Sequence, residues 1–252
     1  MKEEFLFGYG LFETMRAYNR TIVYFDQHLR RILNSSKLIG LKAPYPKAKL
    51  KEKINAAVKR GNFQDAYIRL TFYKREKGTD ILITVKKYQP YPAQKYQRGF
   101  YASISSLRQN EGSLLARLKT TNRLLYQLSL KVAKDKGFDE AIILNQRGYI
   151  AEGSRSNLFF AKSKEIFTSA LACGCLDGIT RQVIFDLAGK YKIKINEGNF
   201  TLEDLKQADE AFFTNSLIGV MPLARIEKES IGKGRCVELT KFFTARYNSL
   251  LK

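Results

Sequence analysis

The pattern of hydrophobic and polar positions divides the chain into two parts, joined by a polar connection at residues 107–118. In the first part, apolar residues recur at helical spacing from His28 to Ile39 and from Lys47 to Arg60. Strands and helices in this order predict an α+β domain over residues 1–106. Alternation of apolar and polar positions predicts its strands at residues 11–18, 22–25, 66–72, 81–86 and 101–105.

The second part, residues 119–252, begins with a helix predicted from Asn122 to Lys136, which ends before Gly137. A second helix is predicted from Thr180 to Tyr191, and Thr201 is expected to begin a third. Because strands and helices do not alternate regularly here, the pattern argues against a Rossmann fold. The predicted strands are residues 140–144, 150–152, 157–161, 165–168 and 210–214.

Composition is that of a soluble globular protein. Of the 252 residues, 44% are hydrophobic and 27% are charged. No apolar stretch approaches the ~18 residues of a membrane span. Met1–Glu4 lead into Phe5 without the form of a signal segment. We therefore expect a cytoplasmic protein with no membrane partner.

Cysteine and histidine are too few for several kinds of site. Cys173, Cys175 and Cys236 form an odd, sparse set, so no disulfide framework is expected, and residues 173 and 175 are interpreted as structural. The one histidine, His28, would have to carry a Ser-His-Asp triad or a metal cluster by itself. No metal site is expected, and a helix-surface or capping role is predicted for His28.

The net charge of +20 has two interpretations. One is a lysine-rich surface, as in thermophilic proteins, and the other is attraction of anionic ligands or nucleic acid. The basic residues are spread along the chain and are not gathered in a tail, although Lys86-Lys87 and residues 190–194 are denser runs. This spread argues against a nucleic-acid partner.

Four short segments carry the candidate chemistry. They are residues 118–124, 152–159, 178–181 and 214–216. Together they supply a lysine, an acid followed by small polar residues, the start of a helix, and a turn with a hydroxyl group. Pyridoxal 5'-phosphate (PLP) needs these groups: an amine for its aldehyde, a carboxylate for its pyridine nitrogen, and N–H and hydroxyl donors for its phosphate.

In this order and spacing the segments resemble the class IV aminotransferase family, also called fold type IV PLP enzymes. The family includes branched-chain aminotransferases, D-amino acid aminotransferases and 4-amino-4-deoxychorismate lyases. The resemblance extends from the Phe-Gly-Tyr-Gly-Leu-Phe-Glu-Thr segment at residues 7–14 to Val220-Met221-Pro222. It implies PLP as cofactor, a homodimer, and a two-domain α+β architecture with a small α/β domain and a larger, barrel-like domain with a mixed sheet.

The family motifs, matched residue by residue, also imply how the cofactor is held. Lys119 would bond to the aldehyde and act in catalysis, and Glu152 would pair with the protonated pyridine nitrogen. Arg31 aligns with the arginine of the family's His-x-x-Arg-Leu segment, although a helix-surface arginine is the alternative. The residues expected on the phosphate are Arg31, Ile179, Thr180, Asn215 and Ser216.

Substrate residues are expected on strands of the first domain. Tyr67-Ile68-Arg69 resembles the segment with which branched-chain aminotransferases hold the substrate carboxylate, and alternation puts Tyr67 and Arg69 on one strand face. An exposed strand arginine is the alternative. Phe12 would line the pocket, although core packing explains it equally well. Thr14 is a candidate catalytic hydroxyl that would position a leaving group.

Three positions favour one reaction within the family. Thr14 after Phe-Glu, Arg123 after Asn122, and the segment at residues 214–217 all resemble the lyases, whereas Tyr67-Ile68-Arg69 resembles the branched-chain group. We therefore expect a 4-amino-4-deoxychorismate lyase that releases pyruvate and forms p-aminobenzoate. A branched-chain or D-amino acid aminotransferase is the alternative, and a binding protein without activity is a third, which the intact lysine and glutamate disfavour.

Overall fold

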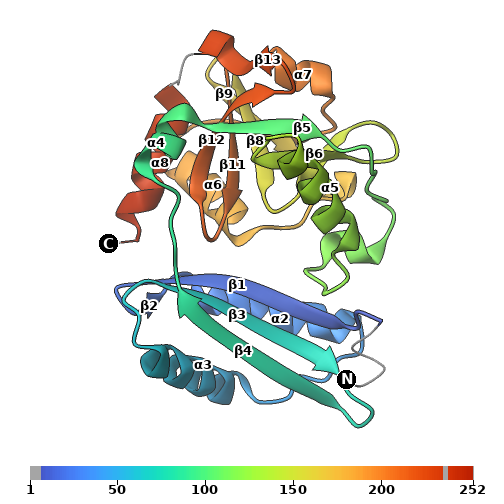
Figure 1. The fold of residues 1–252 in the computed structure, drawn as a ribbon, viewed down its shortest axis with the longest axis vertical. Coiled ribbons are helices and arrows are strands. Elements are labelled where there is room, and N and C mark those ends of the chain that lie inside the picture. The colour runs from blue at the N-terminus through green and yellow to red at the C-terminus, as the bar shows by residue number, and fades with distance from the viewer. Residues whose placement is uncertain (1–6, 235–237, 252) are drawn as a thin grey trace. The chain divides into compact units, whose positions relative to one another are not determined.

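A computed structural model of the protein describes residues 7–234 and 238–251. By their contacts, these residues form two compact units (Figure 1). One unit holds the residues up to Pro90 together with Leu118–Arg123, and the other holds Tyr91–Arg117 and Leu124–Leu250. Among the described residues, no helix is long and apolar enough to cross a membrane.

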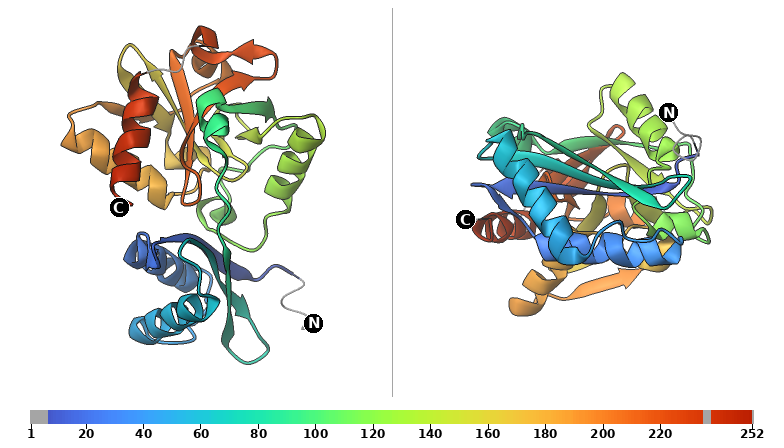
Figure 2. Two further views of the ribbon diagram at one scale, coloured as in Figure 1. Left: turned by 60° about the vertical axis from the view of Figure 1, so that its left-hand side comes forward. Right: turned by 90° about the horizontal axis from the view of Figure 1, so that it is seen from below.

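The first unit is a four-stranded antiparallel sheet with helices on one face. Helix α2 (Phe25–Leu38) packs on β1, and helix α3 (Lys47–Gly61) packs on β3 and β4. Both helices lie on the same face of the sheet in each view (Figures 1 and 2). The strand order is β2-β1-β3-β4, with β1 at Gly10–Tyr18, β2 at Thr21–Ile22, β3 at Ala66–Lys74 and β4 at Thr79–Lys87.

Alternation along β1 decides which side chains the helices cover. Leu11 and Met15 are buried in a core that includes Leu29 of α2. Phe12 and Thr14 are out of phase with these residues, so they lie on the opposite face of the sheet. This second face is the one on which site residues are expected.

The second unit is built on a nine-stranded mixed sheet. The strand order is β10-β9-β8-β11-β12-β5-β6-β7, and β13 pairs with β12. At one end of this order, β7 also contacts β8 and β9, so the sheet curls toward a barrel. The strands are β5 (Phe100–Ile104), β6 (Glu140–Leu144), β7 (Ile150–Gly153), β8 (Asn157–Lys162), β9 (Glu165–Ser169), β10 (Ile195–Gly198), β11 (Glu210–Asn215), β12 (Gly219–Ile226) and β13 (Glu229–Ser230).

Helices pack on this sheet from several directions. Helix α5 packs on β5 and β6, helix α4 packs on β12, and helices α6 and α8 pack on each other and on β11. Thr201 caps helix α7 through a capping box with Asp204. The bounds are α4 Ala93–Arg98, α5 Leu124–Asp135, α6 Ile179–Lys190, α7 Leu202–Lys206 and α8 Glu238–Ser249.

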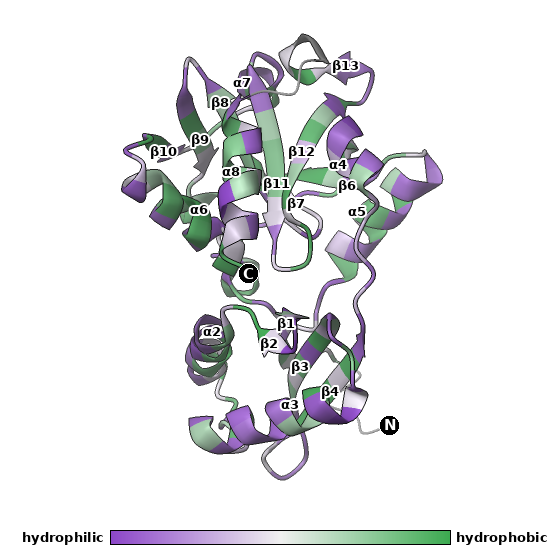
Figure 3. Ribbon diagram, turned by 90° about the vertical axis from the view of Figure 1, so that its left-hand side faces the viewer, coloured by the Kyte–Doolittle hydropathy of each residue, from purple (hydrophilic) through white to green (hydrophobic). Residues whose placement is uncertain are grey.

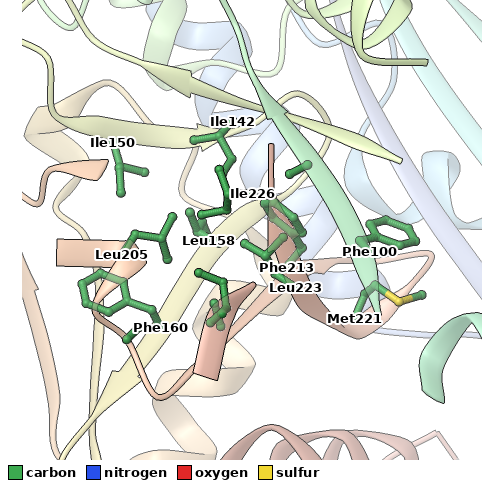
Figure 4. Packing of buried hydrophobic residues seen from close by; sticks show 14 of the residues in the cluster. Phe100, Ile142, Ile150, Leu158, Phe160, Leu205, Phe213, Met221, Leu223 and Ile226 are labelled. Atoms are coloured by element: carbon green, nitrogen blue, oxygen red, sulfur yellow. The ribbon is translucent and has the colours of Figure 1, made fainter. Parts of the chain in front are cut away.

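Apolar side chains from neighbouring strands form the core of the second unit. Leu158, Phe213 and Ile226 belong to one buried cluster and lie close together in Figure 4. Figure 3 shows how hydropathy differs between whole elements. Hydrophobic residues lie along much of β11 and β12, and polar residues lie along much of α3. Burial of this apolar surface is the main stabilising contribution to the unit.

The two units differ from the boundaries expected from the sequence. Strand β5, expected in the first domain, pairs with β6 and β12 of the second unit. Residues 119–123, expected at the start of the second domain, belong with Leu118 to the first unit because their segment pairs with β1. Both corrections come from pairings between segments far apart in the sequence, which local patterns do not reveal.

Most predicted helices and strands are present with ends shifted by a few residues. The strand expected at residues 22–25 is shorter, because α2 already begins at Phe25. Strand β12 and helix α8 were not predicted. Pro222 lies within β12, and a proline in the sequence argues against a central strand.

Candidate functional site

Backbone pairing with β1 holds the segment that carries Lys119. The N–H of Phe12 donates to the carbonyl oxygen of Lys119, and the N–H of Thr121 donates to that of Gly10, both over 2.8 Å. A Cβ added at Gly10 would lie 2.7 Å from the carbonyl oxygen of Phe72, so a larger residue would force the strands apart. The two backbone hydrogen bonds fix the Lys119 segment beside β1.

The Lys119 side chain extends over Phe12, on the sheet face that α2 does not cover. Its Nζ lies 4.7 Å from the centroid of the Phe12 ring, and Cζ of Arg69 lies 3.8 Å from the same centroid. Thr14 is opposite Arg69 in the register of β1 and β3, and Tyr67 stands two positions before Arg69 on β3 and so on the same face. These five residues, all expected from the sequence, are thus gathered on one face. Two cations near one ring favour an anionic ligand such as a carboxylate.

Arg31 lies on the other side of β1, where it contacts Glu13. Its Nε donates to Oε1 of Glu13 over 2.7 Å, and its Nη2 donates to Oε2 over 2.6 Å. His28 Nδ1 lies 2.7 Å from the same Oε2. Glu13 and His28 are each 1% exposed, so the helix-surface role expected for His28 is wrong. Its side chain points from α2 toward the sheet and binds a buried carboxylate.

The charges in this cluster are set by its burial and by Arg31. Burial raises the pKa of Glu13, but attraction by Arg31 and hydrogen bonds from Arg31 and His28 outweigh it and lower the pKa to about 2. Burial lowers the pKa of His28, so its ring is neutral near neutral pH. Because a carboxylate only accepts hydrogen bonds, the neutral His28 carries its proton on Nδ1 and donates it to Glu13.

In the second unit, Glu152 lies at the end of β7 and is 3% exposed. Its Oε2 accepts the N–H of Leu176 over 3.1 Å. The turn that follows is held by Glu140, whose Oε1 accepts the N–H and the hydroxyl of Ser154 and whose Oε2 accepts the hydroxyl of Ser156. Glu140 is itself 1% exposed. A second buried carboxylate thus holds the turn that directly follows Glu152.

The expected residues Ile179 and Thr180 begin helix α6. No side chain caps this helix at Gly178, and the first N–H groups of a helix have no partner within it. The Thr180 hydroxyl is buried and has no hydrogen-bond partner among the residues that the structure describes. A Cβ added at Gly178 would lie 2.1 Å from Oδ1 of Asn157, so a larger residue would displace that buried side chain. This helix start offers donors for an anion such as a phosphate group.

Asn215 is the last residue of β11, and Ser216 follows it in the turn to β12. The Asn215 side chain donates to the carbonyl oxygen of Arg155 and accepts the N–H groups of Leu217 and Ile218. It therefore builds the turn, so that a contact with an anion would come from its backbone or from Ser216. Next to it, the buried hydroxyl of Thr214 has no partner within the described part of the chain.

Sequence reasoning missed the two acids that organise these segments, Glu13 and Glu140. Each stands in a strand, and Glu13 interrupts the apolar series of Leu11 and Met15 on the helix-covered face. Such an interruption was the available signal, because a buried acid needs partners that stay close to it. Cys173 and Cys175, interpreted as structural, are buried free thiols, and Cys236 lies outside the described residues.

The chain matches the family described as amino-transferase class IV over residues 10–226. It is 31% identical to the branched-chain-amino-acid aminotransferase of Pseudomonas aeruginosa, over 97% of this chain and 85% of that protein. It is also 31% identical to the aminodeoxychorismate lyase of Bacillus subtilis, over 90% of this chain and 81% of that protein.

A solved structure has the same fold. The branched-chain amino acid aminotransferase of Escherichia coli superposes with a TM-score of 0.91 and 25% identity, over 100% of this chain and 88% of that chain. The α+β architecture with a small domain and a barrel-like larger domain, expected from the sequence, is thereby confirmed. The chain belongs to the class IV aminotransferases, the family of PLP-dependent transaminases and lyases with fold type IV.

Proposed function

We propose that this protein is a PLP-dependent 4-amino-4-deoxychorismate lyase, which forms p-aminobenzoate and pyruvate. The observation that carries the proposal is the position of Thr14. It stands two residues from Phe12, whose ring contacts Lys119, and it lies opposite Arg69 on the same sheet face. A hydroxyl on the same sheet face as an amine and a guanidinium suits a substrate that bears a carboxylate and loses an oxygen-linked leaving group.

The residues present fit PLP. Lys119 offers an amine, Glu152 is a buried carboxylate, and the start of α6 offers N–H groups with the buried, unpartnered Thr180 hydroxyl beside them. Lys119 would hold the aldehyde and Glu152 the pyridine nitrogen. Arg31, Ile179, Thr180 and Ser216, with the backbone of Asn215, would bind the phosphate.

Once bound, PLP supplies an electron sink for the carbon that carries the substrate amine. The Lys119 amine takes the proton from that carbon. The electron pair released there expels the enolpyruvyl oxygen from the neighbouring carbon, and Thr14 orients this leaving group. The ring becomes aromatic, and the leaving group takes up a proton and becomes pyruvate. The two products together contain all atoms of the substrate, so no oxidant is needed.

A transaminase is the second candidate, favoured by Arg69 and by the relatives. Tyr67 and Arg69 share a sheet face with Phe12, as expected for the carboxylate-binding segment of branched-chain enzymes. The relative from Pseudomonas aeruginosa is named a branched-chain enzyme. In this reaction Lys119 would take and hold the proton from the substrate, and an amino group would pass from the substrate to a 2-oxo acid. A D-amino acid substrate is the further alternative within this reaction.

The proposal includes the assembly implied by the family resemblance and the location expected from composition. We infer a homodimer that acts in the cytoplasm on a small amino substrate, with no membrane or nucleic-acid partner. Sedimentation equilibrium of the purified protein tests the first part of this inference. A species with the mass of one chain, independent of concentration, would exclude the dimer.

One experiment separates the two reactions. Purified protein is loaded with PLP, and pyruvate is measured after addition of 4-amino-4-deoxychorismate with no 2-oxo acid present. Pyruvate release identifies the lyase, whereas amino transfer from L-leucine or D-alanine to 2-oxoglutarate identifies a transaminase. Lys119→Ala should abolish either activity and the absorbance of bound PLP. Thr14→Val should slow pyruvate release, and unchanged turnover would remove Thr14 from the mechanism. A wild-type protein that binds no added PLP would refute the proposed function.

A further inference from the structure

Glu13 stands in β1 between two residues of the proposed site but faces the other way. Phe12 and Thr14 lie on the sheet face near Lys119, whereas the Glu13 carboxylate points to α2 and is 1% exposed. There it meets Arg31, to which the proposed function assigns the PLP phosphate. Glu13 therefore connects the strand that carries site residues with the proposed phosphate-binding arginine.

The contact between Glu13 and Arg31 fixes the direction of the guanidinium. Nε and Nη2 of Arg31 each donate to a different carboxylate oxygen, at 2.7 and 2.6 Å. Two parallel hydrogen bonds between planar groups define both the plane of the guanidinium and the direction of its remaining nitrogen. A single contact would leave the side chain free to rotate. The Arg31 side chain is 15% exposed, and the Glu13 carboxylate that it contacts is 1% exposed.

His28 restricts the carboxylate in turn. Its Nδ1 donates to Oε2 of Glu13 over 2.7 Å, and the ring is 1% exposed. The groups that face this cluster from β1, α2 and the Lys119 segment are Glu13, Arg31 and Lys119, each of which contributes to the charge state of His28. With a neutral ring, the cluster holds one carboxylate and one guanidinium in a buried position where an unpaired charge would be costly.

We propose that Glu13 is a positioning residue, which together with His28 holds the Arg31 guanidinium in the orientation that binds the PLP phosphate. The inference rests on the proposed function. It adds that phosphate affinity is set by a group that does not touch the phosphate. A carboxylate that only joined α2 to β1 would stabilise the fold without favouring a phosphate-bearing ligand.

Comparison of PLP with pyridoxal, which lacks the phosphate, separates these two roles. Protein freed of cofactor is titrated with each compound, and the dissociation constants are read from absorbance. For Glu13→Gln we expect PLP to bind about tenfold more weakly, as for loss of a hydrogen bond to a charged group, while pyridoxal affinity stays the same. If the ratio of PLP affinity to pyridoxal affinity stays the same, whether both ligands bind more weakly or neither does, the proposal is overturned.

A double variant keeps the inference testable if Glu13→Gln alone fails to fold. Arg31→Gln combined with Glu13→Gln removes both charges, so no unpaired guanidinium is left buried. Because Glu13 acts through Arg31, Glu13→Gln should not change the ratio of PLP to pyridoxal affinity when Arg31 is already glutamine. A change of the ratio that persists in this background would overturn the inference.

Asp65→Asn is the matched control. Asp65 accepts a hydrogen bond from Arg16 over 2.8 Å, and Arg16 lies on the same strand as Glu13. No phosphate role is proposed for this pair. The control should leave the affinity ratio unchanged, and an equal change in the control would overturn the inference. If the wild-type protein binds no PLP, the proposed function fails and this inference with it. If it binds PLP and Glu13→Gln leaves the ratio unchanged, the inference fails alone.

Discussion

Replacement of Glu13 by glutamine should lower the free energy of unfolding by about 3 kcal/mol near neutral pH. The pKa of Glu13 falls from its ordinary value of 4.5 to about 2 on folding. At about 1.4 kcal/mol for each pKa unit, this difference corresponds to about 3 kcal/mol of stabilisation. A similar figure, about 3–5 kcal/mol, is typical when one partner of a buried ion pair is removed.

The sign of the pH dependence follows from the direction of the shift. A carboxyl group whose pKa is lower in the folded state stabilises that state fully above its unfolded pKa, here 4.5. The stabilisation is lost as the pH falls toward the folded pKa of about 2. Between about pH 7 and about pH 3, linkage removes about 2 kcal/mol of it. Glutamine cannot titrate, so the difference between wild type and Glu13→Gln should shrink by this amount.

Urea unfolding, followed by circular dichroism at several pH values, measures this difference. Equal slopes against denaturant in both proteins would show that the same surface is exposed on unfolding. A difference in stability that stays constant from about pH 7 to about pH 3 would refute the argument, because Glu13 would then have no depressed pKa. Asp65→Asn should cost about 1 kcal/mol or less, since the Asp65 and Arg16 side chains are 32% and 16% exposed.

Three further results are expected. Glu210 accepts the N–H groups of Leu239 and Thr240 at the start of α8, so Glu210→Ala should lower stability by about 2 kcal/mol, and an unchanged melting temperature would contradict this. Gly178→Ala should weaken PLP binding, since its Cβ would lie 2.1 Å from Oδ1 of Asn157, and wild-type affinity in a titration would exclude a steric effect. Burial, together with the charge of Glu152, raises the pKa of Cys175 to about 12, so peptide mapping should find it unmodified by iodoacetamide until the protein unfolds. Equal labelling in the folded protein would contradict the last prediction.

Local patterns predicted the strands that carry the site but not the partners of their polar residues. Alternation placed Tyr67 and Arg69 on one face of a strand, and the register of β1 and β3 adds Thr14 to that face. The pairing of Glu13 with His28 could not be predicted in this way. It joins a strand to a helix 15 residues away, and only the packing of α2 on β1 brings the two side chains together.

The assignment of segments to units had the same limit. The segment at residues 119–123 follows a polar connection and includes the predicted start of a helix at Asn122, so the sequence suggested the start of a new domain. Its backbone instead pairs with β1, through hydrogen bonds between residues more than 100 positions apart. Such pairings depend on which edge of a sheet is available, and hydrophobic periodicity contains no information about that edge.

Both units use a buried carboxylate next to the segment that carries proposed site residues. Glu13 holds β1 against α2 while its two neighbours in sequence face the proposed site. Glu140 lies on β6 and holds the turn after β7, where Glu152 stands. A carboxylate accepts several hydrogen bonds at once, so one acid can fix donors from two elements.

In a chain with 44 basic and 24 acidic residues, such acids are scarce, and their burial makes each one harder to replace. Glutamine at position 140 would retain one acceptor oxygen and replace the other with an amide donor. We therefore expect the geometry around Glu152 to depend on the charge of Glu140, as that of Arg31 depends on Glu13.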